Sequence, residues 1–453
     1  MRCPIGRRLI AVTCPVSLTV ALAACAGEPK QTTDESTTAG STGAAGTSGS
    51  TGASGASGST AGMGGSAGTA ATGGSDTMAG TGATMTMMAG AGGAVEAGGA
   101  GAGGMTSAGS GGDSAGSSAS GGADGGGQAP STDTEGRCKP VGWATRDGRT
   151  GSAVEVDGGG DATPVVAKSF AELQSYAGDG QPRVIHIDDT LGSGWNGTSG
   201  DRLEVGSNKT IVGVRPGIQL RAPIHVGNAT NVIIRNLVIK GPGSNSDQAW
   251  DNINIDGSSK NVWIDHCEFW DGQDGNADVV KGADNVTFTF NVFGYRTNGG
   301  HNFSNLVASS DNEPQSEGKL NITLMFNWFT GVAQRQPRCR YGDIHVVNNL
   351  FTRDGQPSDY GISAGKDCRI LTEANHFIDI KSPIYTSHAS GSAANQLRGD
   401  NIFESTSGNT TGYGTAFEPP YEYQHVLVKS SEVKALVEAK VGATLESPTQ
   451  CDW

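Results

Sequence analysis

Arginine is concentrated in one short segment, and its side chain is well suited to binding anions. Arg335, Arg338 and Arg340 lie within the run Arg335-Gln336-Pro337-Arg338-Cys339-Arg340. Each guanidinium presents a planar fork of hydrogen-bond donors that matches a carboxylate. The segment therefore predicts contact with an acidic ligand. The alternatives are a surface basic patch and structural pairing with nearby aspartates.

Three aspartates upstream of this segment are candidate metal ligands: Asp251, Asp274 and Asp278. Carboxylates crowded on one face repel one another unless a cation pairs them. Oxygen ligands in an irregular arrangement suit Ca²⁺, a hard cation that tolerates variable geometry. Incomplete ligation by protein would leave room for water and for a substrate carboxylate. The alternative is that these are solvated turn residues, since Asp274-Gly275 is an ordinary turn pair.

A repeating column of residues predicts the elements that position these groups. An Asn, any residue and then a large apolar residue recur after strand-like runs. The column consists of Asn236, Cys267, Asn291, Asn327, Asn349, Asn375 and Asn401, at intervals of 31, 24, 36, 22, 26 and 26 residues. Such a period predicts an all-β solenoid with a ladder of asparagine amides and a lumen filled by Phe and Trp. A β-sandwich with accidental spacing is the alternative.

The candidate ligands lie at similar offsets from this column. Counted back from the column residue of each coil, the offsets are 16 for Asp251, 17 for Asp274, 13 for Asp278 and 14 for Arg335. Adjacent coils of a solenoid stack about 4.8 Å apart. We therefore expect the three aspartates and Arg335 to project from one side of the same sheet.

The chain has two distinct compositions. Residues 31–136 contain no Lys, Arg, Trp, Tyr or Phe and consist mostly of Gly, Ala, Ser and Thr. This composition predicts a disordered linker, because it buries too little apolar surface to offset its conformational entropy. Residues 137–453 are long enough for one large domain. The net charge of −14 argues against nucleic acid as a partner and means that a polyanionic substrate needs a local cation or an arginine cluster.

The N-terminus predicts export. Basic residues precede an apolar run that ends in Leu22-Ala23-Ala24-Cys25, which resembles a bacterial lipobox. We expect a lipoprotein signal peptide over residues 1–24, followed by a lipidated Cys25 and the linker over 25–136. The protein would then be an outer-membrane or cell-surface lipoprotein that touches the membrane only through its lipid. The alternative is an ordinary secretory signal and a secreted protein.

The domain contains five cysteines, and an exported context permits disulfides. Cys138 and Cys451 flank the domain, so their pairing would join its ends. Cys339 and Cys368 lie about one repeat apart and are a second candidate pair. Cys267 would then be a buried thiol. The spacing alone leaves the connectivity open.

Five ordered motifs resemble those of the pectate lyase family of polysaccharide lyases. They are Val262-Trp263-Ile264-Asp265-His266; Asp274-Gly275-Asn276-Ala277-Asp278 with Lys281-Gly282; Leu306-Val307-Ala308-Ser309-Ser310-Asp311; the segment from Arg335 to Arg340; and Ile344-His345-Val346-Val347-Asn348-Asn349. The resemblance implies a right-handed parallel β-helix over residues 137–453. It also implies calcium ligands at Asp251, Asp274 and Asp278, a proton-abstracting base at Arg335 and a substrate carboxylate contact at Arg340.

The resemblance further implies Ca²⁺-assisted β-elimination on pectate, the (1→4)-α-D-galacturonan of plant cell walls, by a monomeric lyase. The chain departs from the family at Phe303, where the family carries a substrate-binding Lys. Arg296 is the candidate replacement, and Arg338 is a further candidate substrate contact. Ala249 stands where some members have another Asp ligand, for which Asp247 is the candidate substitute.

Two other functions stay open. A pectin lyase would act on methyl-esterified substrate without calcium, but the retained aspartates argue against it. A non-catalytic β-helix that binds polysaccharide, such as an adhesin, is disfavoured by Arg335 and kept open by Phe303.

Overall fold

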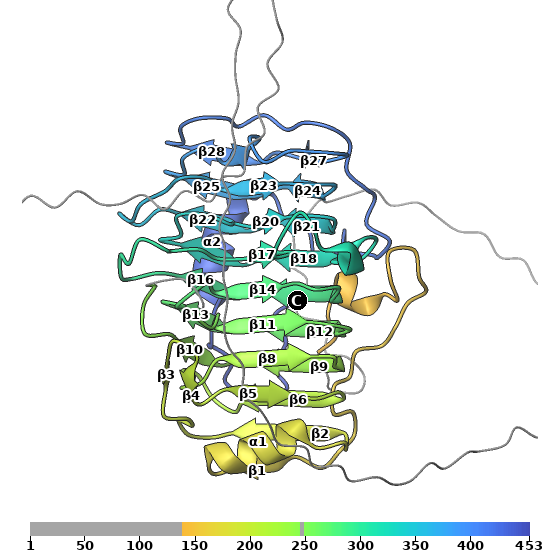
Figure 1. Cartoon of the computed structure of the whole chain (residues 1–453), viewed down its shortest axis with the longest axis vertical. Coiled ribbons are helices and arrows are strands. Elements are labelled where there is room, and N and C mark those ends of the chain that lie inside the picture. The colour runs from red at the N-terminus through yellow and green to blue at the C-terminus, as the bar shows by residue number, and fades with distance from the viewer. Residues whose placement is uncertain (1–137, 245–248) are drawn as a thin grey trace, which may run out of the picture. The chain divides into compact units, whose positions relative to one another are not determined.

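Each coil of the chain contributes one short strand to each of three parallel sheets, and successive coils stack to form a solenoid (Figure 1). The structure is a computed structural model that describes residues 138–244 and 249–453. The expected parallel β-helix is confirmed. The predicted signal peptide over 1–24, Cys25, the linker over 25–136 and Asp247 all lie outside the described residues.

We number the sheets in the order in which a coil meets them. Sheet 1 contains β5 (Leu203–Val205), β8 (Ile224–Gly227), β11 (Ile253–Asp256), β14 (Ala277–Val279), β17 (Leu306–Val307), β20 (Arg338–Cys339), β23 (Ile362–Ala364) and β26 (Ile384–Tyr385). Sheet 2 contains β1 (Val165–Ala167), β2 (Arg183–Ile187), β6 (Lys209–Gly213), β9 (Thr230–Arg235), β12 (Lys260–Asp265), β15 (Asp284–Thr289), β18 (Ile322–Met325), β21 (Asp343–Val347), β24 (Arg369–Glu373) and β27 (Ala394–Arg398). Sheet 3 contains β7 (Gln219–Leu220), β10 (Val238–Lys240), β13 (Glu268–Trp270), β16 (Val292–Gly294), β19 (Trp328–Thr330), β22 (Leu350–Thr352), β25 (His376–Ile378) and β28 (Ile402–Glu404).

A few elements lie outside these sheets. An antiparallel pair is formed by β3 (Trp195–Asn196) and β4 (Ser199–Gly200). Two short 3₁₀ turns, η1 (Trp143–Thr145) and η2 (Pro314–Ser316), and two helices, α1 (Phe170–Gly178) and α2 (Ser430–Lys440), complete the described elements.

The corner between sheets 2 and 3 is a sharp turn that repeats in every coil. One residue per coil takes a left-handed conformation there: Asn236, His266, Phe290, Phe326, Asn348 and Ala374, with φ between 50° and 57°. The next residue is the column residue, and it faces inward. Asn291, Asn327, Asn349, Asn375 and Asn401 form a continuous ladder in which each Nδ2 donates to the Oδ1 of the next, at 3.0–3.1 Å. Because buried amides are costly when unpaired, the ladder favours one register.

One member of the predicted column is wrong. The register pairs Val238 with Glu268, so Leu237 lies opposite Cys267 and Asn236 lies opposite His266. Asn236 therefore stands one residue before the ladder position. Its Nδ2 instead donates to the carbonyl of Leu445, at 2.9 Å, which anchors the C-terminal segment.

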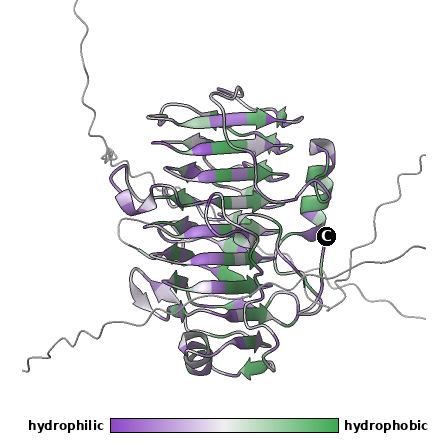
Figure 2. Ribbon diagram, turned by 90° about the vertical axis from the view of Figure 1, so that its right-hand side faces the viewer, coloured by the Kyte–Doolittle hydropathy of each residue, from purple (hydrophilic) through white to green (hydrophobic). Residues whose placement is uncertain are grey.

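The lumen is filled by phenylalanine. Phe269, Phe293, Phe329, Phe351, Phe377 and Phe403 stack coil upon coil, with ring centroids 4.4–5.5 Å apart. The expectation that Trp would share this lumen is wrong for Trp328 of β19. That side chain lies on the outer side of sheet 3, where it packs in the apolar cluster that includes Val433 and Val437 of α2. Figure 2 shows apolar residues recurring at the same places in successive coils, as this stacking requires.

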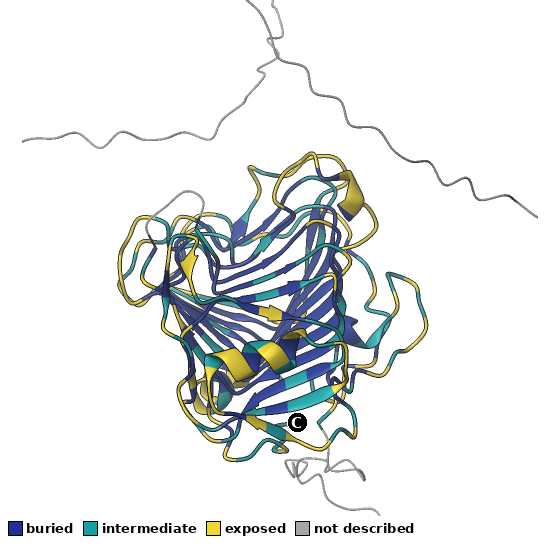
Figure 3. Ribbon diagram, turned by 60° about the horizontal axis from the view of Figure 1, so that its bottom comes forward, coloured by how far each residue is buried: buried dark blue, intermediate teal, exposed yellow. Residues whose placement is uncertain are grey.

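The ends of the solenoid are closed by other elements. At the N-terminal end α1 lies across the stack (Figure 3), with Leu173 and Ala177 buried in the lumen core. The helix begins after Ser169, whose Oγ accepts from the Glu172 backbone N–H at 3.2 Å. No helix within residues 138–244 and 249–453 combines the length and apolar character needed to cross a membrane.

Disulfides join Cys138 to Cys451, with Cα atoms 5.5 Å apart, and Cys339 to Cys368, with Cα atoms 5.9 Å apart. These are the two pairs that the spacing favoured. Cys267 is a buried free thiol, and burial raises its pKa to about 12, so it is poorly reactive.

Candidate active site

The candidate site lies on the outer face of sheet 1. Strand register places Asn254, Asp278, Leu306, Arg338 and Ser363 in one row, each one coil beyond the last. Their neighbours along each strand are buried apolar residues of the lumen. Because side chains alternate across a strand, the row points outward.

Arg335 reaches this face through an extra residue in its coil. Phe303 pairs with Gln334 and Leu306 pairs with Arg338. The segment from Gln334 to Arg338 is therefore one residue longer than the segment from Phe303 to Leu306 that it lies beside. Arg335 is the residue with left-handed backbone here, with φ of 64°. Such an insertion bends a strand and re-aims a side chain. The guanidinium carbon lies 4.4 Å from the centroid of the Phe303 ring.

Asp251 precedes β11 and Asp278 lies in β14, and both side chains are buried. Their exposed fractions are 9% and 7%. Gly275 leaves the space between them open, since a Cβ there would lie 2.7 Å from Asp251 Oδ1 and 3.5 Å from Asp278 Oδ1. The structure therefore brings these two carboxylates together, one coil apart, as the offsets predicted.

Burial and repulsion between carboxylates disfavour the charged form of Asp251 and Asp278, so the pKa of each is raised. Burial, followed by repulsion from Asp278 and Asp274, raises the pKa of Asp251 well above its ordinary value. Burial also raises the pKa of Asp278 to about 7, against the opposing effect of Arg335. Arg335 thus acts electrostatically on both. Oxygen donors of this kind are what a hard cation would neutralise.

Asp274 belongs to the same group but faces another partner. Its Oδ1 lies 3.0 Å from Nε2 of His301, and its side chain is 35% exposed. Within the described part of the chain, no three His, Cys, Asp or Glu side chains converge on one point suited to a metal. The charge and donor chemistry of Asp251 and Asp278 fit Ca²⁺, whereas Asp274 would have to turn from His301 to join them. Ala249 offers no ligand.

The other two arginines of the segment differ in their surroundings. Arg340 forms an ion pair with Asp311, and its Nη1 donates to the Ala308 carbonyl at 2.9 Å. For Arg340 the structural-pairing alternative therefore holds in the free protein. Arg338 lies beside Tyr360, and burial lowers the pKa of Arg338.

Arg296, the predicted replacement for the missing Lys, lies over another sheet. Its guanidinium carbon is 3.9 Å from the ring centroid of Trp270 in β13 of sheet 3. Its backbone N–H donates to Asp271 Oδ1 at 2.9 Å, which fixes the loop there. The structure therefore groups Asp251, Asp274, Asp278 and Arg335 but places Arg296 at Trp270.

Sequence reasoning missed several residues beside the site. His301 contacts Asp274 as described, and its ring lies 3.8 Å from that of Phe303. At the other end, His388 Nδ1 lies 2.8 Å from Ser363 Oγ. Burial and the nearby Arg338 and Arg340 lower the pKa of His388 to about 4, so its imidazole is neutral near pH 7. The loops that carry His301 and His388 do not follow the repeat, so the spacing of the column could not predict their contacts.

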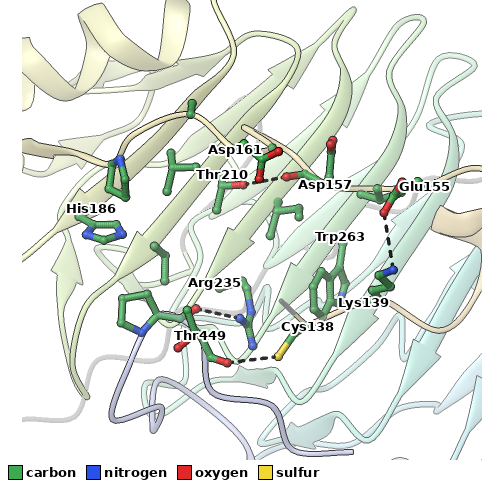
Figure 4. A pocket seen from close by; sticks show the side chains of 18 residues that line it. Cys138, Lys139, Glu155, Asp157, Asp161, His186, Thr210, Arg235, Trp263 and Thr449 are labelled. Carbon is green, nitrogen blue, oxygen red and sulfur yellow. Dashed lines mark hydrogen bonds and ion pairs between the residues drawn. The ribbon is translucent and has the colours of Figure 1, made fainter. Parts of the chain in front are cut away.

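A hollow with a volume of about 470 Å³ lies elsewhere, on the outer face of sheet 2 (Figure 4). It is lined by His186, Thr210, Arg235 and Trp263 among others. Arg235 is held there by Asp265, with Nε 2.8 Å from Oδ2, and by the carbonyls of Pro448 and Gln450. Of the predicted site residues, the disulfide cysteine Cys138 lines this hollow, and the predicted metal, catalytic and substrate-binding residues do not. The candidate site is instead the row of side chains on sheet 1.

Comparisons with known proteins identify the family. A family model described as pectate lyase matches residues 130–444. Pectate lyase A of Aspergillus niger is 33% identical over 287 residues, which cover 61% of this chain and 81% of that enzyme. Pectate trisaccharide-lyase of Bacillus licheniformis is 29% identical over 317 residues, covering 67% and 86%.

Solved structures share the fold. A pectate lyase from Bacillus sp. N165, determined in complex with trigalacturonate, superposes with a TM-score of 0.54 at 27% identity, covering 67% of this chain and 98% of that one. The family match spans the whole described β-helix and the arginine segment. The chain therefore belongs to the pectate lyase family of enzymes.

Proposed function

We propose that this protein cleaves pectate by Ca²⁺-assisted β-elimination, with Arg335 as the base. The observation that carries the proposal is the placement of Arg335 on the same face of sheet 1 as the buried carboxylates of Asp251 and Asp278. The names of the relatives and the trigalacturonate bound by one of them support the substrate class.

The reaction removes the proton at C5 of a galacturonate residue, and the electron pair of that bond forms the C4–C5 double bond. The bond between C4 and its glycosidic oxygen breaks, and the leaving oxygen takes a proton from water. Arg335 would accept the C5 proton, which requires its neutral form, and this favours alkaline pH because a free guanidinium keeps its proton at neutral pH. Stabilising the charge that develops at the C6 carboxylate is the main task of the site. Bound Ca²⁺ would supply a Lewis acid for that carboxylate.

Asp251 and Asp278 would hold the cation, with Asp274 joining them. Arg338 would contact a substrate carboxylate from its place in the outward row, two coils beyond Asp278. Arg340 would do so after exchanging its ion pair with Asp311 for one with the substrate. A forked guanidinium suits this exchange, since it can bind two carboxylate oxygens at once.

We also propose that the protein is exported and meets its substrate outside the cell. The two disulfides support an oxidising compartment. The lipobox-like Leu22-Ala23-Ala24-Cys25 supports a lipid anchor, and a secreted form is the alternative.

A second candidate, a pectin lyase acting on methyl esters, is favoured by one observation. Phe303 is uncharged and lies against Arg335, at a position where the family carries a Lys. A substrate with neutral ester groups would bind beside such an uncharged surface better than one with a full set of carboxylates.

The test is the rate at which unsaturated product absorbs in the ultraviolet, measured with the full chain on polygalacturonate and on methylated pectin, with Ca²⁺ or with a chelator. Calcium-dependent activity on polygalacturonate that disappears in Arg335→Ala supports the proposal. Arg353→Ala, which removes a half-exposed arginine paired with Asp379 at 3.7 Å, is the matched control and should keep full activity. Activity restricted to methylated pectin and indifferent to chelator would establish the pectin lyase instead, and binding without turnover would establish a non-catalytic β-helix.

A further inference from the structure

We infer that Phe303 is a positioning residue that holds the Arg335 guanidinium over the buried carboxylates, and that His301 braces it from the far side. The inference rests on the proposed function, in which Arg335 acts on the substrate. It assigns a role to a position at which the chain departs from its family.

The side chains of Arg335, Phe303, His301 and Asp274 form a continuous series of contacts across three coils. Arg335 lies 4.4 Å from the Phe303 ring centroid, the Phe303 and His301 rings lie 3.8 Å apart, and His301 Nε2 lies 3.0 Å from Asp274 Oδ1. A guanidinium within about 6 Å of an aromatic face is attracted by the ring quadrupole. The ring therefore attracts the cation without competing for its donors.

Among the described residues, the Phe303 ring is the close side-chain contact that the structure gives Arg335. Its Nε is buried and makes no hydrogen bond. Asp251 and Asp278 act on it through charge rather than through a hydrogen bond. A ring contact is therefore the interaction that sets the orientation of the side chain.

Phe303 is itself firmly held, which a positioning residue requires. Its carbonyl accepts from Tyr295 Oη at 2.7 Å, and its N–H donates to the His301 carbonyl at 2.9 Å. Tyr295 is buried, so this support comes from the interior of the fold. These two bonds fix the backbone at Phe303, and the ring itself lies against the Arg335 guanidinium and the His301 ring.

The test compares Phe303→Leu, which removes the ring but keeps an apolar side chain, with Phe303→Tyr, which keeps the ring. On polygalacturonate, Phe303→Leu should lower kcat about tenfold, or about 1.4 kcal/mol, with KM changed less than about twofold. Phe303→Tyr should restore kcat to within about twofold of the wild type. Phe403→Leu, the same change in the lumen stack of the last coil, is the matched control for effects on folding and should leave kcat unchanged.

A second readout is independent of turnover. The ring current of Phe303 should shift the Arg335 Nε–H resonance upfield in protein labelled with ¹⁵N-arginine, and Phe303→Leu should abolish that shift while Phe303→Tyr keeps it. An unshifted wild-type resonance, or a Phe303→Leu enzyme with wild-type kcat, would overturn the inference. A shifted resonance in a protein without lyase activity would uphold the stack and reject the proposed function.

Discussion

The carboxylate of Asp278 repels that of Asp251 across one coil of sheet 1, and burial raises the pKa of both. Two buried like charges destabilise the fold that contains them unless a cation relieves the repulsion. The domain therefore carries a local instability at the point where the proposed chemistry needs a cation. This juxtaposition makes the metal hypothesis testable through stability as well as through activity.

Asp278→Asn should stabilise the chelator-treated protein and remove its response to calcium. Replacing one carboxylate by an amide relieves the repulsion, by roughly 1–3 kcal/mol in the free energy of unfolding. Thermal denaturation with and without Ca²⁺ measures both effects. We expect Ca²⁺ to raise the Tm of the wild type but not that of Asp278→Asn, which should also lose lyase activity.

Asp400→Asn is the control, because Asp400 is exposed on the surface of the last coils. It should leave the calcium response intact. An unchanged Tm of the wild type on adding Ca²⁺ would count against a calcium site at these aspartates.

The amide ladder should contribute strongly to stability. Asn349→Ala would remove the acceptor of the Asn327 backbone N–H, at 2.9 Å, and the side-chain donor to the Leu324 carbonyl, at 2.8 Å. We expect a loss of about 2–4 kcal/mol in the free energy of unfolding, since buried polar atoms would be unpaired. Denaturant titration measures the loss. Asn298→Ala, at an exposed loop position, should change it by less than about 0.5 kcal/mol.

A buried ionic cluster should make the stability of the C-terminal segment depend on pH. His266 Nδ1 lies 2.8 Å from Asp265 Oδ2, and its Nε2 lies 3.0 Å from Asp452 Oδ2. Burial alone would lower the pKa of His266, and Arg235 acts in the same direction, but the two carboxylates outweigh both and raise it. The same cluster lowers the pKa of Asp265 to about 2, against the effect of burial.

The sign of the pH effect follows from these directions. A raised histidine pKa adds stability that is complete below the ordinary value of 6.5 and is lost as the pH rises through the folded value. We therefore expect the Tm to fall as the pH is raised above 6.5, and Asp452→Asn to reduce that slope. His425→Gln, at an exposed histidine, should follow the wild type. A wild-type Tm that is flat or rising over this range would contradict the prediction.

The repeat made the fold and most of the site predictable. Offsets of 13 to 17 residues from the column placed the aspartates and Arg335 on one sheet, and the structure groups them there. The periodicity worked because stacking ties each coil to its neighbours in register. The periodicity gave the wrong position for Asn236. An interval between two column residues does not show whether an additional residue lies before or after the corner between sheets 2 and 3.

Contacts between loops were not predictable from the sequence. His301 reaches Asp274 across 27 residues from a loop that has no period of its own. Asp311 pairs with Arg340 from the preceding coil, so an arginine that resembled a free substrate contact is engaged. Trp328 followed the column yet lies outside sheet 3, because a strand alternates its faces and only Phe329 points inward.

The ion pair between Arg340 and Asp311 leads to the last prediction. Its partner Asp311 is 65% exposed, whereas the Arg340 side chain is 11% exposed, so the aspartate can move away and the arginine stays. Asp311→Asn should therefore remove a competitor for the guanidinium and lower KM for polygalacturonate about two- to threefold, because an exposed pair contributes less than about 1 kcal/mol. Arg340→Ala should raise KM about tenfold or more with a smaller effect on kcat, since one charge-assisted contact is lost. Asp400→Asn and Arg353→Ala are the matched controls for the two changes. A higher KM in Asp311→Asn would show that the pair organises Arg340 for the substrate rather than competing with it.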